Sequence, residues 1–478
     1  MILLKANLQN FQLFVCFSIV LTDVEYYTKP KAFLMAVLEK KNWLLLVSTA
    51  LIAGAFYVAI GYFIPRTSFS NFIILISGLF VTYFIMSSGR LAQNYLKELL
   101  ILSFVFRVLF LFSMPALSDD YFRFIWDGLL SAHGTNPYAL APETINNLPG
   151  TNPSWFMDQL KAGMNSLQYY SVYPPLLQAV FYVSVKIGGA NILNDLIVYR
   201  VFVLLAEAGT IYTAIKLLKH FKLPTRNILF YALNPLVNIE FSGNLHGEVF
   251  MIFLLSLAFL FLVKEQLLWS AIFVGLAISA KLLPLIFMPA IVSFLGIKKG
   301  AVYSMLVMLV FIISFLPFTD QTFIDHIATS VGLYFDKFEF NASIYYLLLW
   351  VGYDVTGVNI IFVLGKIMPL FAIAAILLIA FKQRILTFEV LVKRILLTIV
   401  AYYLFSLVVH PWYVTVLVFL TMFSRYRFSL VWSFLIMLTY SAYAQNPHRE
   451  VLWLTGIEYI IVGAFIFKEL KYGKEQLF

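Results

Sequence analysis

Residues 99–117, LLILSFVFRVLFLFSMPAL, form an apolar run that is followed at once by an acid-bearing stretch at 118–138, SDDYFRFIWDGLLSAHGTNPY. A membrane-spanning helix needs about 20 predominantly apolar residues, and a charge at the bilayer centre costs at least about 2.5 kcal/mol. The run therefore predicts a membrane helix. The carboxylates of Asp119, Asp120 and Asp127 are expected just outside the membrane.

The rest of the chain has the same apolar character. Of its 478 residues, 62% are hydrophobic and 12% are charged, and its mean hydropathy is +0.89. The apolar runs are continuous and do not alternate with period two, which favours helices over barrel strands. We therefore expect an all-α polytopic membrane protein with about 13 to 14 spans. The apolar runs begin near residues 43, 70, 99, 195, 227, 247, 267, 283, 300, 357, 395, 412, 428 and 450.

The basic residues predict the sidedness of these spans. The net charge of +9 comes from short Lys and Arg clusters between apolar runs, a pattern that sets topology and does not indicate a nucleic-acid partner. The clusters fall at every second junction, so the positive-inside rule places those junctions and both chain ends in the cytoplasm. The outward-facing parts are then 115–194, 240–248, 318–356, 410–413 and 444–450.

The chain is expected to form a single transmembrane domain at 43–470 without internal repeats. Residues 1–42 form an N-terminal segment that is expected in the cytoplasm, unless the chain starts at Met35 instead. Residues 173–189 are apolar enough to span, but a full crossing there would reverse the sidedness of the later basic clusters. We interpret them as an interfacial or re-entrant helix. The single cysteine, Cys16, excludes a disulfide framework.

Asp119 and Asp120 are the first candidates for chemistry. Acids at a helix end can simply mark the water boundary. Here, however, Arg123 and Asp127 follow at helical spacing, with Trp126 nearby, so that a carboxylate, a cation and apolar bulk share one region. That combination is typical of a general base or a metal ligand.

The turn GNLHGE (243–248) is the second candidate, because it brings Asn244, His246 and Glu248 within five positions. A packed polar residue is the simpler interpretation of the histidine. The spacing matches no tetrahedral zinc motif, whereas a hard divalent cation such as Mg²⁺ or Mn²⁺, held by Asp120 and Glu248, is compatible with the two loops. Whether a metal is needed stays open.

Lys281 is the third candidate. It follows a cytoplasmic junction by about 15 residues, which carries it to the outer half of the bilayer. It either snorkels to the interface or provides a fixed cation for a lipid-borne phosphate. We also expect Arg123 and His410 to contact this phosphate. The residues expected to contact substrate are Trp126, Asp127, Asn136, Tyr138, Tyr173, Asn244, His246, Glu248, Trp412 and Tyr413.

The order of these motifs resembles the GT-C superfamily of membrane glycosyltransferases, and most closely its bacterial mannosyltransferase-like members that use polyprenyl-phosphate sugars. The resemblance covers about residues 99–425 and rests on several short motifs. These are an acid followed by an aromatic, a glycine and G-x-N-P-Y in a large first outer loop, then YPPLLQ, ALNPLVNIEFSGNLHGE, AISAKLLPL and HPWY.

The resemblance implies an inverting hexosyltransferase that moves a sugar, mannose by family likeness, from a polyprenyl phosphate to a glycan or lipid acceptor. Aligning the acid eight residues before Gly128 gives the role of base to Asp120, with Asp119 as the alternative. The expected location is the bacterial inner membrane, with the active site on the extracytoplasmic face. The alternatives are a transporter or flippase, and an O-antigen-polymerase-like ligase of lipid-linked glycans.

Overall fold

The computed structural model describes residues 24–145, 154–336, 338–445 and 448–472. Within these ranges the regular secondary structure is helical, apart from one isolated bridge between Phe340 and Val408. The predicted all-α class is therefore confirmed. The expectations for Cys16 and for the start of the chain fall outside the described residues.

Five described helices are long and apolar enough to cross a membrane, or six if one bent pair is a single broken span. This confirms a multi-pass membrane protein, although the number is smaller than the 13 to 14 predicted from apolar runs. The reason is that several of those runs fold into helices too short to cross alone. The shorter apolar helices are Pro175–Gly188, Leu267–Ile278, Leu283–Leu295, Pro411–Thr421 and Phe428–Ala444.

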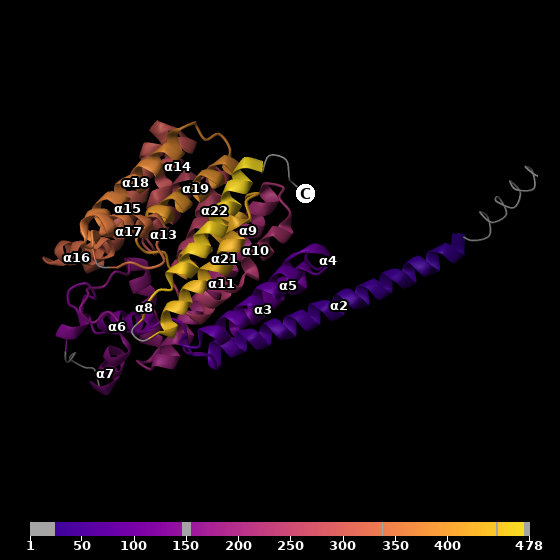
Figure 1. Cartoon of the computed structure of the whole chain (residues 1–478), viewed down its shortest axis with the longest axis horizontal. Helices are drawn as coiled ribbons and strands as arrows, with labels where there is room; N and C mark the ends of the chain where they lie inside the picture. The colour runs from indigo at the N-terminus through magenta and orange to yellow at the C-terminus, as the bar shows by residue number, and fades with distance from the viewer. Residues whose placement is uncertain (1–23, 146–153, 337, 446–447, 473–478) are drawn as a thin grey trace, which may run out of the picture.

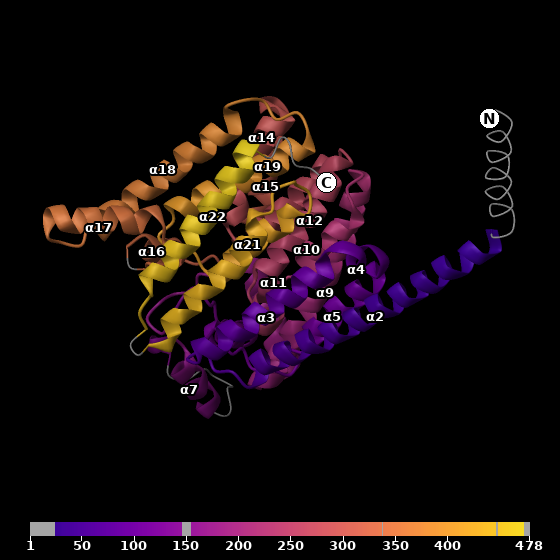
Figure 2. The ribbon, with the colours of Figure 1, turned by 45° about the vertical axis from the view of Figure 1, so that its right-hand side comes forward.

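The N-terminal helices pack as one group, with α2 and α3 antiparallel and α5 beside them (Figures 1 and 2). Their bounds are α2 (Val24–Tyr62), α3 (Phe69–Ser87), α4 (Gly89–Asn94) and α5 (Leu96–Val108). The apolar run that begins near residue 99 remains helical only to Val108. Residues 109–112 form a turn that leads to Pro115.

The part of the chain at 115–194, which the sequence predicts to face outward and which we call the first outer loop, folds into short helices at one end of the bundle (Figure 1). They are α6 (Asp120–Ala132), η1 (Pro142–Thr144), α7 (Ser154–Gly163) and α8 (Pro175–Gly188). Helices α6 and α8 touch backbone to backbone, since a Cβ on Gly128 would lie 2.5 Å from the carbonyl oxygen of Phe181. With 14 residues, α8 is too short to cross a bilayer by itself.

The central part of the chain runs through long and broken helices. It comprises α9 (Ile192–His220), η2 (Thr225–Ile228), α10 (Leu229–Ala232), α11 (Pro235–Asn238), the π-helical turn η3 (Ile239–Gly243), α12 (Glu248–Val263), α13 (Leu267–Ile278), η4 (Leu283–Phe287), α14 (Met288–Leu295) and α15 (Ile297–Phe315). The chain bends by 116° between η3 and α12, so the GNLHGE turn sits at the break of a bent helix pair.

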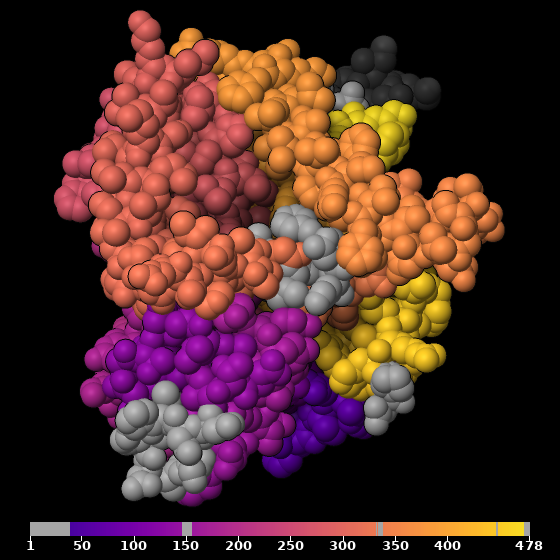
Figure 3. Space-filling model, turned by 90° about the vertical axis from the view of Figure 1, so that its left-hand side faces the viewer, coloured from indigo at the N-terminus to yellow at the C-terminus, as the bar shows by residue number. Residues whose placement is uncertain are grey.

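The C-terminal part adds residues 318–356, which are also predicted to face outward and which we call the second outer loop, and the last helices. It comprises η5 (Leu316–Phe318), α16 (Phe323–Asp336), α17 (Ile344–Thr356), α18 (Ile361–Phe381), α19 (Phe388–Phe405), η6 (Pro411–Val414), α20 (Thr415–Thr421), α21 (Phe428–Leu435), η7 (Ile436–Ala444) and α22 (Leu452–Tyr472). Figure 3 shows the second outer loop, in salmon, lying against the first outer loop, in purple.

Candidate functional site

The two adjacent acids have different surroundings. Asp119 occupies the N-cap position of α6 without a side-chain capping hydrogen bond. Its Oδ2 lies 2.6 Å from Nη1 of Arg66, in the turn between α2 and α3. Asp120 is the first residue of α6, and within the described ranges its carboxyl makes no hydrogen bond or ion pair. The sequence left both acids open as the base. The geometry favours Asp120, because Asp119 is already paired.

The surroundings of Asp120 also change its acidity. Burial is the largest cause and disfavours the charged form, Lys281 opposes it, and the carboxylates of Asp119 and Glu248 add to it. Together they raise the pKa of Asp120 to about 6. A carboxyl with a pKa close to the operating pH is well suited to accept a proton.

The GNLHGE turn is buried and held by protein groups. Glu240, one turn earlier in η3, accepts hydrogen bonds from the Tyr440 hydroxyl at 2.7 Å and from the Asn244 amide at 3.1 Å. Nε2 of His246 lies 3.3 Å from Oε2 of Glu240, the oxygen that also accepts from Asn244. Leu245 adopts a φ of +69°, which turns the chain toward α12. The sequence therefore predicted this turn as part of the site but missed Glu240 and Tyr440.

Lys281 lies where three predicted motifs meet. Its Nζ is 2.7 Å from Oε1 of Glu248, at the first turn of α12, and 5.4 Å from the centre of the Tyr413 ring in HPWY. It is also the cation that acts on the pKa of Asp120. The Lys281 side chain remains 29% exposed, so a further anion can reach it.

The HPWY motif stacks on the GNLHGE turn. The rings of His246 and Trp412 lie 3.6 Å apart, and His410 stacks on Trp412 at 4.4 Å. Burial, assisted by the charge of Lys281, lowers the pKa of His410 to about 3. His410 is therefore neutral near pH 7, and it can meet a phosphate only through a hydrogen bond.

Arg123 and Asp127 form a buried network of their own. Nε of Arg123 lies 2.7 Å from Oδ1 of Asp127, whose other oxygen accepts from Ser171 and, at 2.9 Å, from Gln178. Trp126, between them in sequence, is fully buried. Among the described contacts none joins these side chains to Lys281, so their side chains are placed to hold α6 in the first outer loop.

The residues of GTNPY connect the two outer loops. Nδ2 of Asn136 donates to Asp320 Oδ2 and to the Phe318 carbonyl, both at 2.7 Å, while the Tyr138 hydroxyl donates to the Tyr173 carbonyl at 2.6 Å. These contacts order the loops beside the site.

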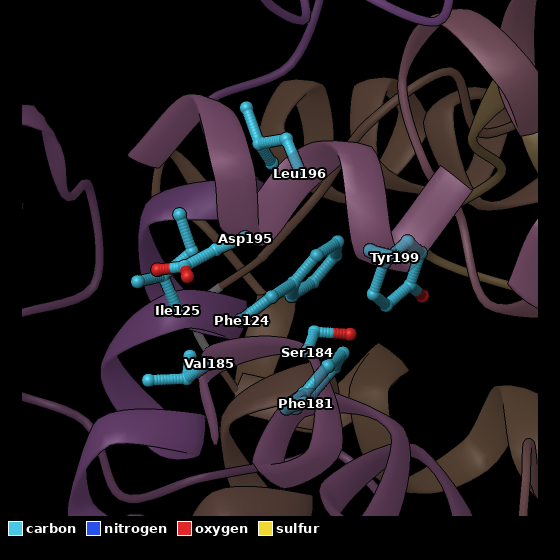
Figure 4. A pocket seen from close by; sticks show the side chains of 8 residues that line it. All are labelled: Phe124, Ile125, Phe181, Ser184, Val185, Asp195, Leu196 and Tyr199. Carbon is cyan, nitrogen blue, oxygen red and sulfur yellow. The ribbon is translucent and has the colours of Figure 1, made fainter. Parts of the chain in front are cut away.

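A separate pocket lies between α6, α8 and α9 (Figure 4). Phe124, Phe181 and Tyr199 contribute aromatic rings, and Asp195 contributes a carboxyl that is 1% exposed. Neither oxygen of Asp195 has a hydrogen-bond partner within the described residues. No sequence motif pointed to this pocket.

A metal would need a different set of ligands. The described residues contain no group of three or more His, Cys, Asp or Glu side chains that could hold a metal ion. Of the two predicted ligands, Glu248 is already paired with the Lys281 ammonium at 2.7 Å. The residues present do not fit a divalent cation at Asp120 and Glu248.

Comparison with known proteins gives one family and two relatives. The family described as alpha-(1->6)-mannopyranosyltransferase, N-terminal domain, matches residues 34–296, which is more than half of the chain. The alpha-(1->6)-mannopyranosyltransferase A of Corynebacterium glutamicum is 22% identical over 199 residues, covering 40% of this chain and 39% of that protein. The protein of the same name from Mycobacterium tuberculosis is 25% identical over 174 residues, covering 36% and 32%.

The chain thus matches about two fifths or less of the length of these curated relatives. No solved structure matches it. The matched residues 34–296 contain the acid pair, the GNLHGE turn and Lys281, whereas HPWY lies beyond them.

Proposed function

The chain belongs to the alpha-(1->6)-mannopyranosyltransferase family, and from this premise we propose that it is a membrane mannosyltransferase that uses a polyprenyl-phosphate sugar. The observation that carries the proposal is Asp120, a carboxyl without a hydrogen-bond or ion-pair partner among the described residues and with a pKa of about 6. It lies near Lys281, a partly exposed cation. Asp120 can accept a proton while Lys281 binds a phosphate.

The proposed step is a single inverting displacement. An acceptor hydroxyl attacks C1 of the mannose from the face opposite the phosphate and loses its proton to Asp120. The bond between C1 and the phosphate oxygen breaks, and its electron pair leaves with the polyprenyl phosphate. The ammonium of Lys281 carries three donors, so it can bind this phosphate while keeping contact with Glu248.

Inversion also constrains the donor. The names of the two relatives specify an alpha-(1->6) linkage for those proteins. If this chain forms the same linkage, an inverting transfer requires a donor whose phosphate is beta-linked to mannose. The acceptor is then a glycan or a glycolipid that offers a primary hydroxyl.

The remaining predicted residues take supporting roles in this proposal. Tyr413, next to Lys281, offers a partly exposed ring to a sugar. Trp412 is stacked against His246 and His410 and holds HPWY on the GNLHGE turn. Arg123 and Asp127 hold α6, and through it Asp120, in place. We further propose that the protein lies in the bacterial inner membrane with this site on the extracytoplasmic face, which is where the positive-inside rule puts the acid pair.

The test compares the purified wild-type protein with Asp120→Asn and with Asp354→Asn, a matched change at an exposed acid on α17. Each is incubated with radiolabelled polyprenyl-phosphate mannose and a mannoside acceptor, and transferred mannose is counted. We expect Asp120→Asn to lose activity by about 10² to 10⁴. Asp354→Asn should match wild type.

Two outcomes would count against the proposal in different ways. Full activity in Asp120→Asn would remove that residue as the base. If the wild-type protein transfers no sugar from any member of a panel of polyprenyl-phosphate sugars, the proposed transferase activity is ruled out. Movement of an intact lipid-linked glycan across proteoliposomes would then favour a flippase, and joining of whole lipid-linked glycans would favour a ligase.

A further inference from the structure

Arg66 contacts the acid pair from another part of the chain. It lies in the turn between α2 and α3, more than fifty residues before Asp119, and no sequence motif marked it. Its Nη1 lies 2.6 Å from Oδ2 of Asp119, and both side chains are mostly buried, at 25% and 30% exposure. The guanidinium also lies over the ring of Tyr443, 5.1 Å from its centre.

These contacts join three elements that are distant in sequence. Arg66 comes from the α2–α3 turn, Asp119 from the N-terminus of α6, and Tyr443 from η7. A planar guanidinium suits both contacts, because it pairs with a carboxylate in its plane and stacks on an aromatic ring through its face. The start of α6 is therefore fixed against the bundle by one side chain.

Arg66 lies next to a cluster of negative charges that its guanidinium can compensate. Two adjacent carboxylates repel each other, and Glu248 adds a third negative charge that acts on Asp120. Lys281 is the cation on the side of Asp120 and Glu248, and Arg66 is the cation on the side of Asp119. Without Arg66, the charge of Asp119 would face Asp120 uncompensated.

We propose that Arg66 is a positioning residue that neutralises Asp119 and thereby leaves Asp120 as the one acid free to act on the acceptor. This inference rests on the proposed function of Asp120 as the base. Arg66 acts through Asp119 and does not touch the reacting atoms. The pair of adjacent acids then has a division of work: Asp119 anchors α6, and Asp120 carries the chemistry.

The experiment is a double-mutant cycle on kcat and KM. Arg66→Gln should lower kcat about tenfold with little change in KM for the donor, because it removes a counter-charge and no substrate contact. Arg66→Lys keeps the charge and should retain most of the activity. In the Asp119→Asn background, Arg66→Gln should have little further effect, because no charge remains to be compensated.

Several outcomes would overturn the inference. Wild-type kcat in Arg66→Gln would do so. An equal loss on Arg66→Gln in the wild-type and Asp119→Asn backgrounds, or a rise in donor KM with kcat unchanged, would make Arg66 a substrate ligand instead. Arg90→Gln, at an exposed arginine of α4, is the matched control and should behave as wild type.

A thermal cycle on the same variants keeps this inference separate from the proposed function. Arg66→Gln and Asp119→Asn should each lower Tm, and the double variant should lower it no further than the larger single change. This non-additivity is measurable even if the wild-type protein transfers no mannose, a result that would count against the proposed function alone. Strictly additive losses of Tm would show that Arg66 and Asp119 act independently, which overturns the inference.

Discussion

At the scale of single residues, Asp120 determines the expected pH dependence. A base must be ionised, and burial raises the pKa of Asp120 to about 6. We therefore expect kcat/KM to fall as the pH drops through about 6, by about tenfold for each further unit. Asp119 contributes to raising this pKa. In Asp119→Asn, the fall of kcat/KM on the acidic side of the pH profile should therefore move to lower pH. Transfer rates between about pH 5 and pH 8 test this, and a fall that stays in place in the variant would contradict it.

The raised pKa of Asp120 also predicts that removing its negative charge stabilises the folded protein. The pKa of Asp120 is higher in the folded protein than the ordinary value of 3.8. The ionised form is therefore disfavoured by the fold, and its cost is present above about pH 6 and relieved as the pH falls toward the ordinary value. Asp120→Asn removes this cost, so at about pH 7.5 its Tm should equal or exceed that of wild type while activity is lost. A clearly lower Tm would mean that the carboxylate is needed by the fold.

The structure brings together some of the residues that the sequence predicted for the site and adds Arg66, which no motif marked. Lys281 was chosen as a cation between two apolar runs and Glu248 as part of the GNLHGE turn, and the structure brings them together. Asp127 was expected to share a helical face with Asp120. Seven residues of helix, however, separate the two by about 10 Å along the axis, enough to put them in different networks. Arg66 could not be found, because only tertiary folding brings it to Asp119.

At the scale of elements, the contact between α6 and α8 supports the site. A Cβ on Gly128 would lie 2.5 Å from the Phe181 carbonyl oxygen and 2.8 Å from a methyl group of Val185. Gly128→Ala should therefore push the two helices apart, at a cost of about 1 to 3 kcal/mol, and reduce transfer by displacing Asp120. Thermal unfolding and transfer assays measure both effects.

The matched control for this change is Gly456→Ala in α22, where an added Cβ would meet nothing within 4 Å. It should leave both Tm and transfer unchanged. A Gly128→Ala protein with wild-type Tm would contradict the close helix contact. Loss of transfer without loss of Tm would mean that the displacement of α6 is local.

Apolar runs predicted most helices but not where helices break. The runs predicted near 267, 283 and 428 begin within a few residues of α13, η4 and α21. The bend of 116° between η3 and α12 was not predictable as a geometry, because it depends on a π-helical turn and on a positive φ at Leu245. A hydropathy profile averages over a window of residues and does not detect such a break. The bend is stabilised by the hydrogen bonds that Glu240 accepts from Tyr440 and Asn244.

At the scale of the whole molecule, the proposed function depends on which side of the membrane the acid pair faces. The predicted sidedness rests on the basic clusters between apolar runs. One candidate span offers a direct test, because Ile297–Phe318 joins a basic junction at one end to the second outer loop at the other. Asn136 of the first outer loop donates a hydrogen bond to Asp320 just beyond that span, so both loops share one side.

The last prediction places the two ends of this span on opposite faces. Lys299 and Gln321 are both exposed, one at each end. In a Cys16→Ser background, Gln321→Cys should react with a membrane-impermeant maleimide in intact spheroplasts. Lys299→Cys should react only after the membrane is permeabilised, because basic junctions are retained in the cytoplasm. The reverse pattern would place Asp120 on the cytoplasmic side. The donor would then have to present its sugar there, and the proposed extracytoplasmic acceptor would be ruled out.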